Sequence, residues 1–324
     1  MRFAAFFAAI LCLMCYGADT PSHHATKADV EKWMTELSNW GRWGKNDQIG
    51  TGNLITPAKR REAAALVKDG EAISLAHDAL LEKAPDNPDP FVRKMLYTGA
   101  HPNGDWFMDQ YTVLFHGLAH THMDSLAHTA WKGKMYNGFP QLDVTEREGA
   151  KELAVTGFKN GFFTRAILMD IPRLKGVPYL EPGVGIYPED LEAWEKKAGV
   201  KIGSGDVVLI RTGRWARRAA KGPWDTSRVA GLHVSCVPWL KARDAAVVGS
   251  DACLDVLPSQ VEGVVQPVHQ LLLIAMGTPI FDNFDLEAVA DAAARKNRWS
   301  FLITVAPLAV PGGTGSPVNP TALF

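Results

Sequence analysis

The chain has 324 residues, of which 47% are hydrophobic and 21% charged, and its formal net charge is −1 at pH 7. This length suits one large or two ordinary domains with a substantial core, and the composition is typical of a globular protein. The near-zero charge and the lack of a basic stripe argue against nucleic acid or an anionic membrane surface as a partner.

Residues 1–18 are predicted to form a secretory signal peptide. Met1 and Arg2 precede an apolar run from Phe3 to Tyr16, and small residues follow. A basic start, a short hydrophobic stretch and small residues near the cleavage site are the features of such a peptide. The run is short for a transmembrane helix, and a signal anchor is the alternative. We expect a secreted or periplasmic protein with no stable membrane association after cleavage.

Two of the four cysteines would remain in the mature chain. Cys12 and Cys15 lie within the predicted signal peptide, whereas Cys236 and Cys253 lie far downstream in apolar surroundings. An oxidising compartment permits a disulfide between them, and two buried free thiols are the other interpretation.

The N-terminal part is predicted to be an extension with one helix, residues 19–39, ahead of the main domain, residues 40–324. Apolar residues at helical spacing predict the helix over 27–39. Residues 40–53 are rich in glycine and turn formers and contain two tryptophans. This loop is either the wall of a pocket or a turn with packed tryptophans beneath it. A helix over 56–68, begun by Thr56 and Pro57, and a strand over 72–75 follow.

Strands and helices alternate in the second half of the chain. We expect strands over 164–171, 206–211, 245–249 and 301–306. We expect helices over 188–197, 235–242, 271–276 and 286–295. This alternation, without any break in composition, predicts a single α/β domain.

Four of the ten histidines lie between residues 116 and 128, around Asp124. The β-branched and aromatic residues 111–115 before them predict a strand that continues through the cluster. Alternate side chains of a strand share one face, so His116, His120, His122 and Asp124 would lie together. Imidazole and carboxylate suit Zn²⁺, Mn²⁺ or Fe²⁺. The alternative is a histidine-rich surface strand with an incidental acid.

Further candidate residues lie near the cluster and much later in the chain. His128 follows Asp124 by four residues, where it is well placed to take a proton from metal-bound water. His269 and Asp282 are separated by an apolar stretch. Taken alone, His269 is more often a core or surface histidine, and Asp282 a turn residue.

With these residues the chain resembles the cyclase family of metal-dependent hydrolases, which includes bacterial kynurenine formamidases and isatin hydrolases. The family motif is approximately His-x-Gly-Thr-His-x-Asp-x-x-x-His, and Thr121, His122, Asp124 and His128 match its second half. Other segments also fit the family, namely residues 43–51, 134–138, 205–213 and 313–317.

The resemblance implies roles for these residues. His122 and Asp124 are expected to bind a first metal, and His128 to act as general acid and base. His269 and Asp282 are expected to bind a second metal in members that hold two. His233 lies where isatin hydrolase-like members have a pocket histidine, although a helix-capping or surface residue is the alternative.

Two departures from the family pattern bear on the metal site. Leu118, which cannot bind a metal, stands at the family's first ligand position. Either His116 or His120 replaces it, and the pair His116-Gly117, which mimics the start of the motif, slightly favours His116. The usual glutamate of the second site is the shorter Asp282, which leaves open whether one or two metals bind.

The sequence thus predicts a metal-dependent hydrolase that cleaves an amide, cyclic amide or imide, or lactone bond with Zn²⁺ or Mn²⁺. Trp43 and Trp131 are expected to line the pocket of a small aromatic or cyclic substrate. The resemblance implies a single compact ββα domain of the swivelling type, with a mixed sheet and flanking helices, assembled as a homodimer or homotetramer. An exported metal-binding protein without catalysis is the alternative.

Overall fold

The computed structural model describes residues 23–102 and 104–324. The predicted signal peptide, residues 1–18, lies outside the described residues. No helix within the described ranges is both long enough and apolar enough to span a membrane.

A nine-stranded mixed sheet forms the centre of the molecule, in the order β1-β15-β13-β7-β9-β11-β12-β4-β14. Its middle strands β7, β9, β11 and β12 are parallel, and the strands on either side of them are antiparallel. The strands are β1 (Ala72–Ser74), β4 (His122–Asp124), β7 (Phe162–Asp170), β9 (Val207–Arg211), β11 (Val247–Ser250), β12 (Ile280–Asp282), β13 (Ser300–Val305), β14 (Gly315–Pro317) and β15 (Thr321–Leu323).

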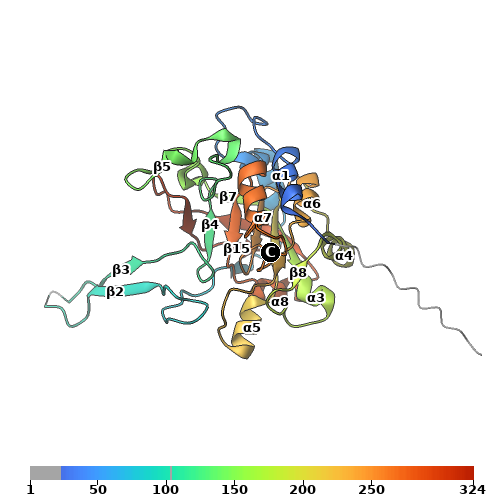
Figure 1. Ribbon diagram of the computed structural model, residues 1–324. Coiled ribbons are helices and arrows are strands. Elements are labelled where there is room, and N and C mark those ends of the chain that lie inside the picture. The colour runs from blue at the N-terminus through green and yellow to red at the C-terminus, as the bar shows by residue number, and fades with distance from the viewer. Residues whose placement is uncertain (1–22, 103) are drawn as a thin grey trace, which may run out of the picture.

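Helices flank this sheet (Figure 1). They are α1 (Lys27–Glu36), α2 (Pro57–Ala64), α3 (Ile171–Lys175), α4 (Pro188–Ala198), α5 (Arg214–Lys221), α6 (Cys236–Ala242), α7 (Pro267–Gln270) and α8 (Glu287–Lys296). A π-helix, η5 (Leu271–Met276), continues directly from α7. Short 3₁₀ turns lie at η1 (Gly50–Leu54), η2 (Tyr136–Gly138), η3 (Gln141–Asp143) and η4 (Val155–Phe158).

The remaining strands form three small ribbons outside the main sheet. β2 (Val92–Tyr97) pairs with β3 (Met108–Thr112), β5 (Val144–Thr145) with β6 (Gly149–Ala150), and β8 (Gly185–Ile186) with β10 (Gly231–Leu232). The β2–β3 ribbon extends away from the body of the molecule as an arm (Figure 1).

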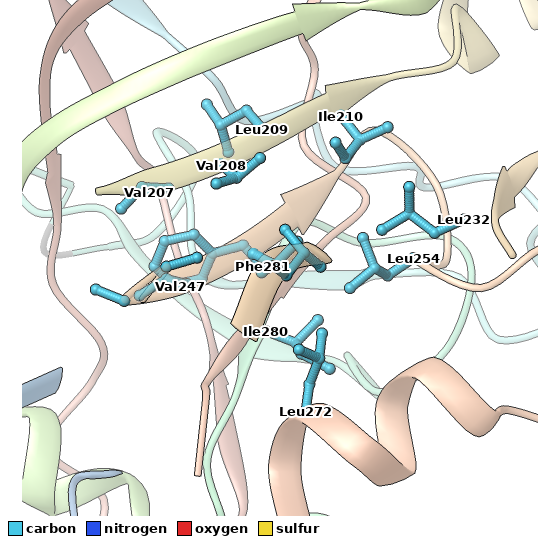
Figure 2. Close-up of a cluster of buried hydrophobic side chains, with 14 of the residues drawn as sticks. Val207, Val208, Leu209, Ile210, Leu232, Val247, Leu254, Leu272, Ile280 and Phe281 are labelled. Carbon is cyan, nitrogen blue, oxygen red and sulfur yellow. The ribbon is translucent and has the colours of Figure 1, made fainter. Parts of the chain in front are cut away.

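The core lies around the parallel strands. Every residue of β9 and β11 is buried, as expected for parallel strands covered on both faces. By the register of β9, β11 and β12, Val208 and Ile280 lie on one face of the sheet and Leu209 and Phe281 on the other, and Figure 2 shows Leu272 of η5 close to Ile280. Polar side chains begin where these strands end, at Ser250 of β11 and Asp282 of β12.

The expected α/β domain is confirmed, and the four strands and four helices predicted in the second half are present. Residues 271–276 form a π-helix, and the helices predicted over 27–39 and 56–68 are shorter than expected. Cys236 and Cys253 are both buried free thiols.

The strand predicted to run from Tyr111 through Asp124 is wrong. β3 ends at Thr112, residues 113–121 have no regular structure, and β4 contains only His122 to Asp124. The chain turns at Gly117, whose φ of 142° lies in the region that favours glycine. The histidines therefore meet through a loop rather than along one strand face.

Candidate metal centre

Strand β4 and its neighbours form the base of the site. His122 and Asp124 are two residues apart on β4, so their side chains point to the same face of the sheet. β12 pairs antiparallel with β4 and brings Asp282 directly opposite His122. All three residues are at least 95% buried. The sheet therefore places two carboxylates and one imidazole side by side.

Loops contribute two further histidines to Asp124. His116 Nδ1, from the loop 113–121, lies 2.9 Å from Asp124 Oδ1, and His122 Nε2 lies 3.4 Å from the same oxygen. His128, in the turn after β4, has its Nε2 3.9 Å from Asp124 Oδ2. The rings of His116 and His128 are stacked, with centroids 4.0 Å apart. Asp124 is thus the centre of a histidine cluster.

His269 reaches the cluster from the opposite side, at the end of the short helix α7. Its Nε2 lies 3.2 Å from Asp282 Oδ2 and 3.8 Å from Asp124 Oδ2. Its Nδ1 lies 2.6 Å from Asp255 Oδ2, and Asp255 also accepts the backbone N–H groups of Val268 and His269. Asp255 therefore orients the ring so that Nε2 faces the carboxylates, as carboxylates behind metal-binding histidines commonly do.

The cluster fits a divalent metal. Ligand atoms of His116, Asp124 and His128 lie within 4.8 Å of one another, and so do those of His122, Asp124 and Asp282. Among the described residues, Asp282 Oδ1 is buried without a hydrogen-bond partner, and Asp124 Oδ1 and His116 Nδ1 lie 2.9 Å apart without forming a well-aligned hydrogen bond. Unpaired buried polar atoms are costly, and a cation bound among them removes that cost. The mixed nitrogen and oxygen ligands suit Zn²⁺ or Mn²⁺.

Burial and charge shift the pKa values of the cluster in opposite directions. Burial raises the pKa of Asp124, but His122 and the other nearby histidines hold it well below its usual value. Burial lowers the pKa of His269, but Asp282 and Asp255 raise it well above its usual value. For His128 burial prevails, and its pKa falls to about 4. His128 is therefore neutral at pH 7, the state in which it can accept a proton.

His120 is not part of this cluster. Its Nε2 lies 3.3 Å from the backbone oxygen of Asp89, and its ring packs edge-on against Phe91 at 6.2 Å. Because the loop turns at Gly117, the shared strand face that would have aligned His120 with His122 does not form. His116 and His120 were the two candidates to replace the ligand that is missing at Leu118. Of these two, the structure brings His116 close to Asp124.

The three predicted substrate-binding residues lie in different places. Trp131, three residues after His128, lines a cavity of about 500 Å³ together with Trp40, although no cluster residue lines that cavity. The guanidinium carbon of Arg42 lies over the ring of Trp43, 4.6 Å from the ring centroid. Their roles in binding substrate stay predictions.

His233 is fully buried beside Tyr187, with ring centroids 5.2 Å apart. Its Nδ1 lies 2.8 Å from Ser235 Oγ, and its Nε2 has no hydrogen-bond partner among the described residues. It is thus a core histidine with one free nitrogen, and its pocket role also stays a prediction.

Sequence reasoning missed Asp255. The residue stands between Leu254 and Val256, and all three are buried. A single acidic residue within an apolar run could have indicated it from the sequence, because a buried carboxylate requires hydrogen-bond or charge partners.

An α/β fold with a cluster of histidines and carboxylates at a strand end defines a candidate metalloprotein. A family model described as putative cyclase matches residues 18–254. The chain therefore belongs to the cyclase family.

Solved structures share the fold. A structure described as a novel cyclase is 32% identical, with a TM-score of 0.80, over 89% of this chain and 98% of the other. Isatin hydrolase A from Labrenzia aggregata is 18% identical, with a TM-score of 0.56, over 80% of this chain and 94% of the other. Isatin hydrolase A from Ralstonia solanacearum is 19% identical, with a TM-score of 0.56, over 78% and 91%. No curated protein matches the chain.

Proposed function

We propose that the protein is a metal-dependent hydrolase that cleaves an amide, cyclic amide or imide, or lactone bond of a small aromatic or cyclic molecule. The observation that carries this proposal is the buried cluster around Asp124, with its unpaired nitrogen and oxygen atoms. Membership of the cyclase family and a fold shared with isatin hydrolases support it.

Five residues would hold the metal, namely His116, His122, Asp124, His269 and Asp282. Asp124 is the carboxylate that His116, His122 and His269 all approach, so it would be a shared ligand of the site. When bound, Zn²⁺ or Mn²⁺ supplies Lewis acidity, which polarises a carbonyl and lowers the pKa of water towards about 7.

His128 would act as the general acid and base. Its side chain is 31% exposed, so a substrate can reach it, whereas Asp124 beside it is buried. The neutral ring accepts a proton from the attacking water at one nitrogen and later returns it to the leaving nitrogen or oxygen. Stacking on His116 fixes the plane of the ring during both transfers.

The test is the His128→Ala variant, assayed on isatin, aryl formamides, cyclic imides and lactones. We expect a rate about 10²–10⁴-fold lower than wild type, the usual contribution of one general acid/base, with the metal still bound. Near-full activity with metal bound would show that His128 is not the base. The matched control is His120→Ala, which removes a nearby histidine outside the cluster.

A metal-binding protein without catalysis is the second candidate. Leu118 at the family's first ligand position and Asp282 in place of a glutamate favour it. It predicts metal binding without turnover of any substrate on the panel, and it leaves His128 without a role.

We also propose that residues 1–18 direct export of the protein and are then cleaved off. N-terminal sequencing of the protein recovered outside the cytoplasm tests the cleavage position. An N-terminus still at Met1 would contradict it.

The β2–β3 arm supports a homo-oligomer. Its tip carries Trp106, Phe107 and Met108, which are 76%, 69% and 47% exposed, and Tyr111 is 61% exposed. Exposed aromatic side chains at this density are typical of protein interfaces, and a two-stranded ribbon is marginal without packing. Light scattering tests this: a Trp106→Asp, Phe107→Asp variant should become monomeric, and Leu142→Asp, off the arm, should not. A monomeric wild type would refute it.

A further inference from the structure

We propose that Arg214 and Asn283 are positioning residues of the metal centre. They hold the irregular loop 113–121 by its backbone carbonyl oxygens and thereby set the place of His116. This inference rests on the proposed function, because it assigns the two residues to the same metal site.

Asn283 makes three hydrogen bonds with residues 117–121. Its side-chain Nδ2 donates to the backbone oxygens of Gly117, at 2.7 Å, and His120, at 3.3 Å. Its own backbone oxygen accepts the hydroxyl of Thr121 at 2.8 Å. The residue directly follows Asp282 and is fully buried, with a φ of 56° that asparagine tolerates. One side chain thus ties the loop to the strand that carries a predicted metal ligand.

Arg214 completes the contact between the two segments. Its Nη1 donates to Asn283 Oδ1 at 2.5 Å, and its Nη2 donates to the backbone oxygen of Leu118. The guanidinium lies over Trp215, 4.7 Å from the ring centroid. The carbonyls of Gly117, Leu118 and His120 are therefore all held from one side of the loop.

The burial of Arg214 is costly and needs an explanation. The residue is 3% exposed, and within residues 23–102 and 104–324 it forms no ion pair with a carboxylate. A buried charge without a directly paired opposite charge is destabilising. The uncharged oxygens that it binds belong to the loop and to Asn283, so holding this loop is the role that its contacts indicate.

His116 depends on this arrangement more than the other ligands do. His122, Asp124 and Asp282 are held by the hydrogen bonds of β4 and β12. His116 lies in a segment without regular structure, one residue before Gly117. A shift of that loop moves His116 Nδ1 away from Asp124 while the strand residues stay in place.

The experiment measures Co²⁺ binding by the purified full chain, through affinity and through the visible absorption spectrum of the bound ion. The variants are Arg214→Met, which keeps the volume without the charge, and Asn283→Gly, which keeps the positive φ without the amide. Arg218→Met is the matched control, because Arg218 lies one turn along α5 and pairs with Asp86 instead. Arg214→Lys keeps the positive charge that Arg214→Met removes, but it offers one ammonium group in place of the two Nη donors.

We expect Arg214→Met and Asn283→Gly to weaken Co²⁺ binding about 10–100-fold, the usual effect of losing a residue behind a metal ligand. Their spectra should resemble that of His116→Ala, and Arg214→Lys should recover part of the affinity. Arg218→Met should keep the wild-type affinity and spectrum, even if its melting temperature falls.

Two results overturn the inference in different ways. Wild-type affinity and spectrum in both Arg214→Met and Asn283→Gly would refute the positioning role alone. A wild-type protein that binds no Co²⁺ would refute the proposed function and this inference with it. If one variant fails to fold, the other still decides between these outcomes.

Discussion

Replacement of Asp255 by asparagine is the sharpest test of the interior of the metal site. Oδ1 of Asp255 accepts the N–H of Val268 at 2.8 Å, and Oδ2 accepts the N–H of His269 at 3.1 Å and its Nδ1 at 2.6 Å. An asparagine has one acceptor oxygen and one donor amide in the same space. In either orientation of the asparagine amide, its NH₂ group faces at least one N–H donor that an oxygen of Asp255 accepts in the wild type.

The size of the effect follows from the bond to Nδ1. A hydrogen bond to a charged group contributes about 1.5–3 kcal/mol. Loss of a carboxylate behind a metal-binding histidine costs about 10–100-fold in metal affinity, which is about 1.4–2.8 kcal/mol. The two ranges agree, so we expect Asp255→Asn to weaken metal binding by one to two orders of magnitude.

The assay is competition for Zn²⁺ between the protein and a chromophoric chelator, with the melting temperature measured on the same samples. Asp206→Asn is the control, since Asp206 is also fully buried and paired, with Arg165 and Lys59, but away from the cluster. Asp206→Asn should melt earlier and keep its Zn²⁺ affinity. Wild-type affinity in Asp255→Asn would refute the orienting role.

Two further predictions concern histidines. His116→Ala should lose metal whereas His120→Ala should retain it, because only His116 approaches Asp124; elemental analysis of both variants decides. Burial lowers the pKa of His233 from 6.5 to about 4, so the unfolded state binds more protons between these values. Stability is therefore lost as the pH falls through this window, and urea unfolding should show a smaller loss for His233→Asn. An equal loss in both proteins would contradict this.

The regular elements of the second half could be predicted from sequence because their patterns are local. β9 and β11 are short apolar runs, and α4 begins with proline and acidic residues and is followed by Gly199 as its C-cap. Each signal lies within the element that it predicts.

The path of the histidine segment could not be predicted in this way. Residues 111–115 have the composition of a strand, but the chain leaves regular structure after Thr112. Contacts from Arg214 and Asn283, about 100 and 165 residues away, hold the loop there. Such distant contacts leave no pattern in the segment itself, so the composition wrongly predicted a continuous strand.

The candidate site itself was largely accessible from the motif. Motif spacing indicated His122, Asp124 and His128, and the resemblance added His269 and Asp282, all of which the structure brings together. The choice between His116 and His120 could be made only from the path of loop 113–121. Asp255 could be recognised only from its contact with His269.

The most direct test of the account is the metal content per chain of the purified protein and of Asp124→Ala, measured by elemental analysis after loading with Zn²⁺ or Mn²⁺. Because Asp124 is the carboxylate that His116, His122 and His269 all approach, the account predicts bound metal in the wild type and none in Asp124→Ala. A wild type without metal under every loading condition, or an Asp124→Ala variant with wild-type metal content, would contradict it.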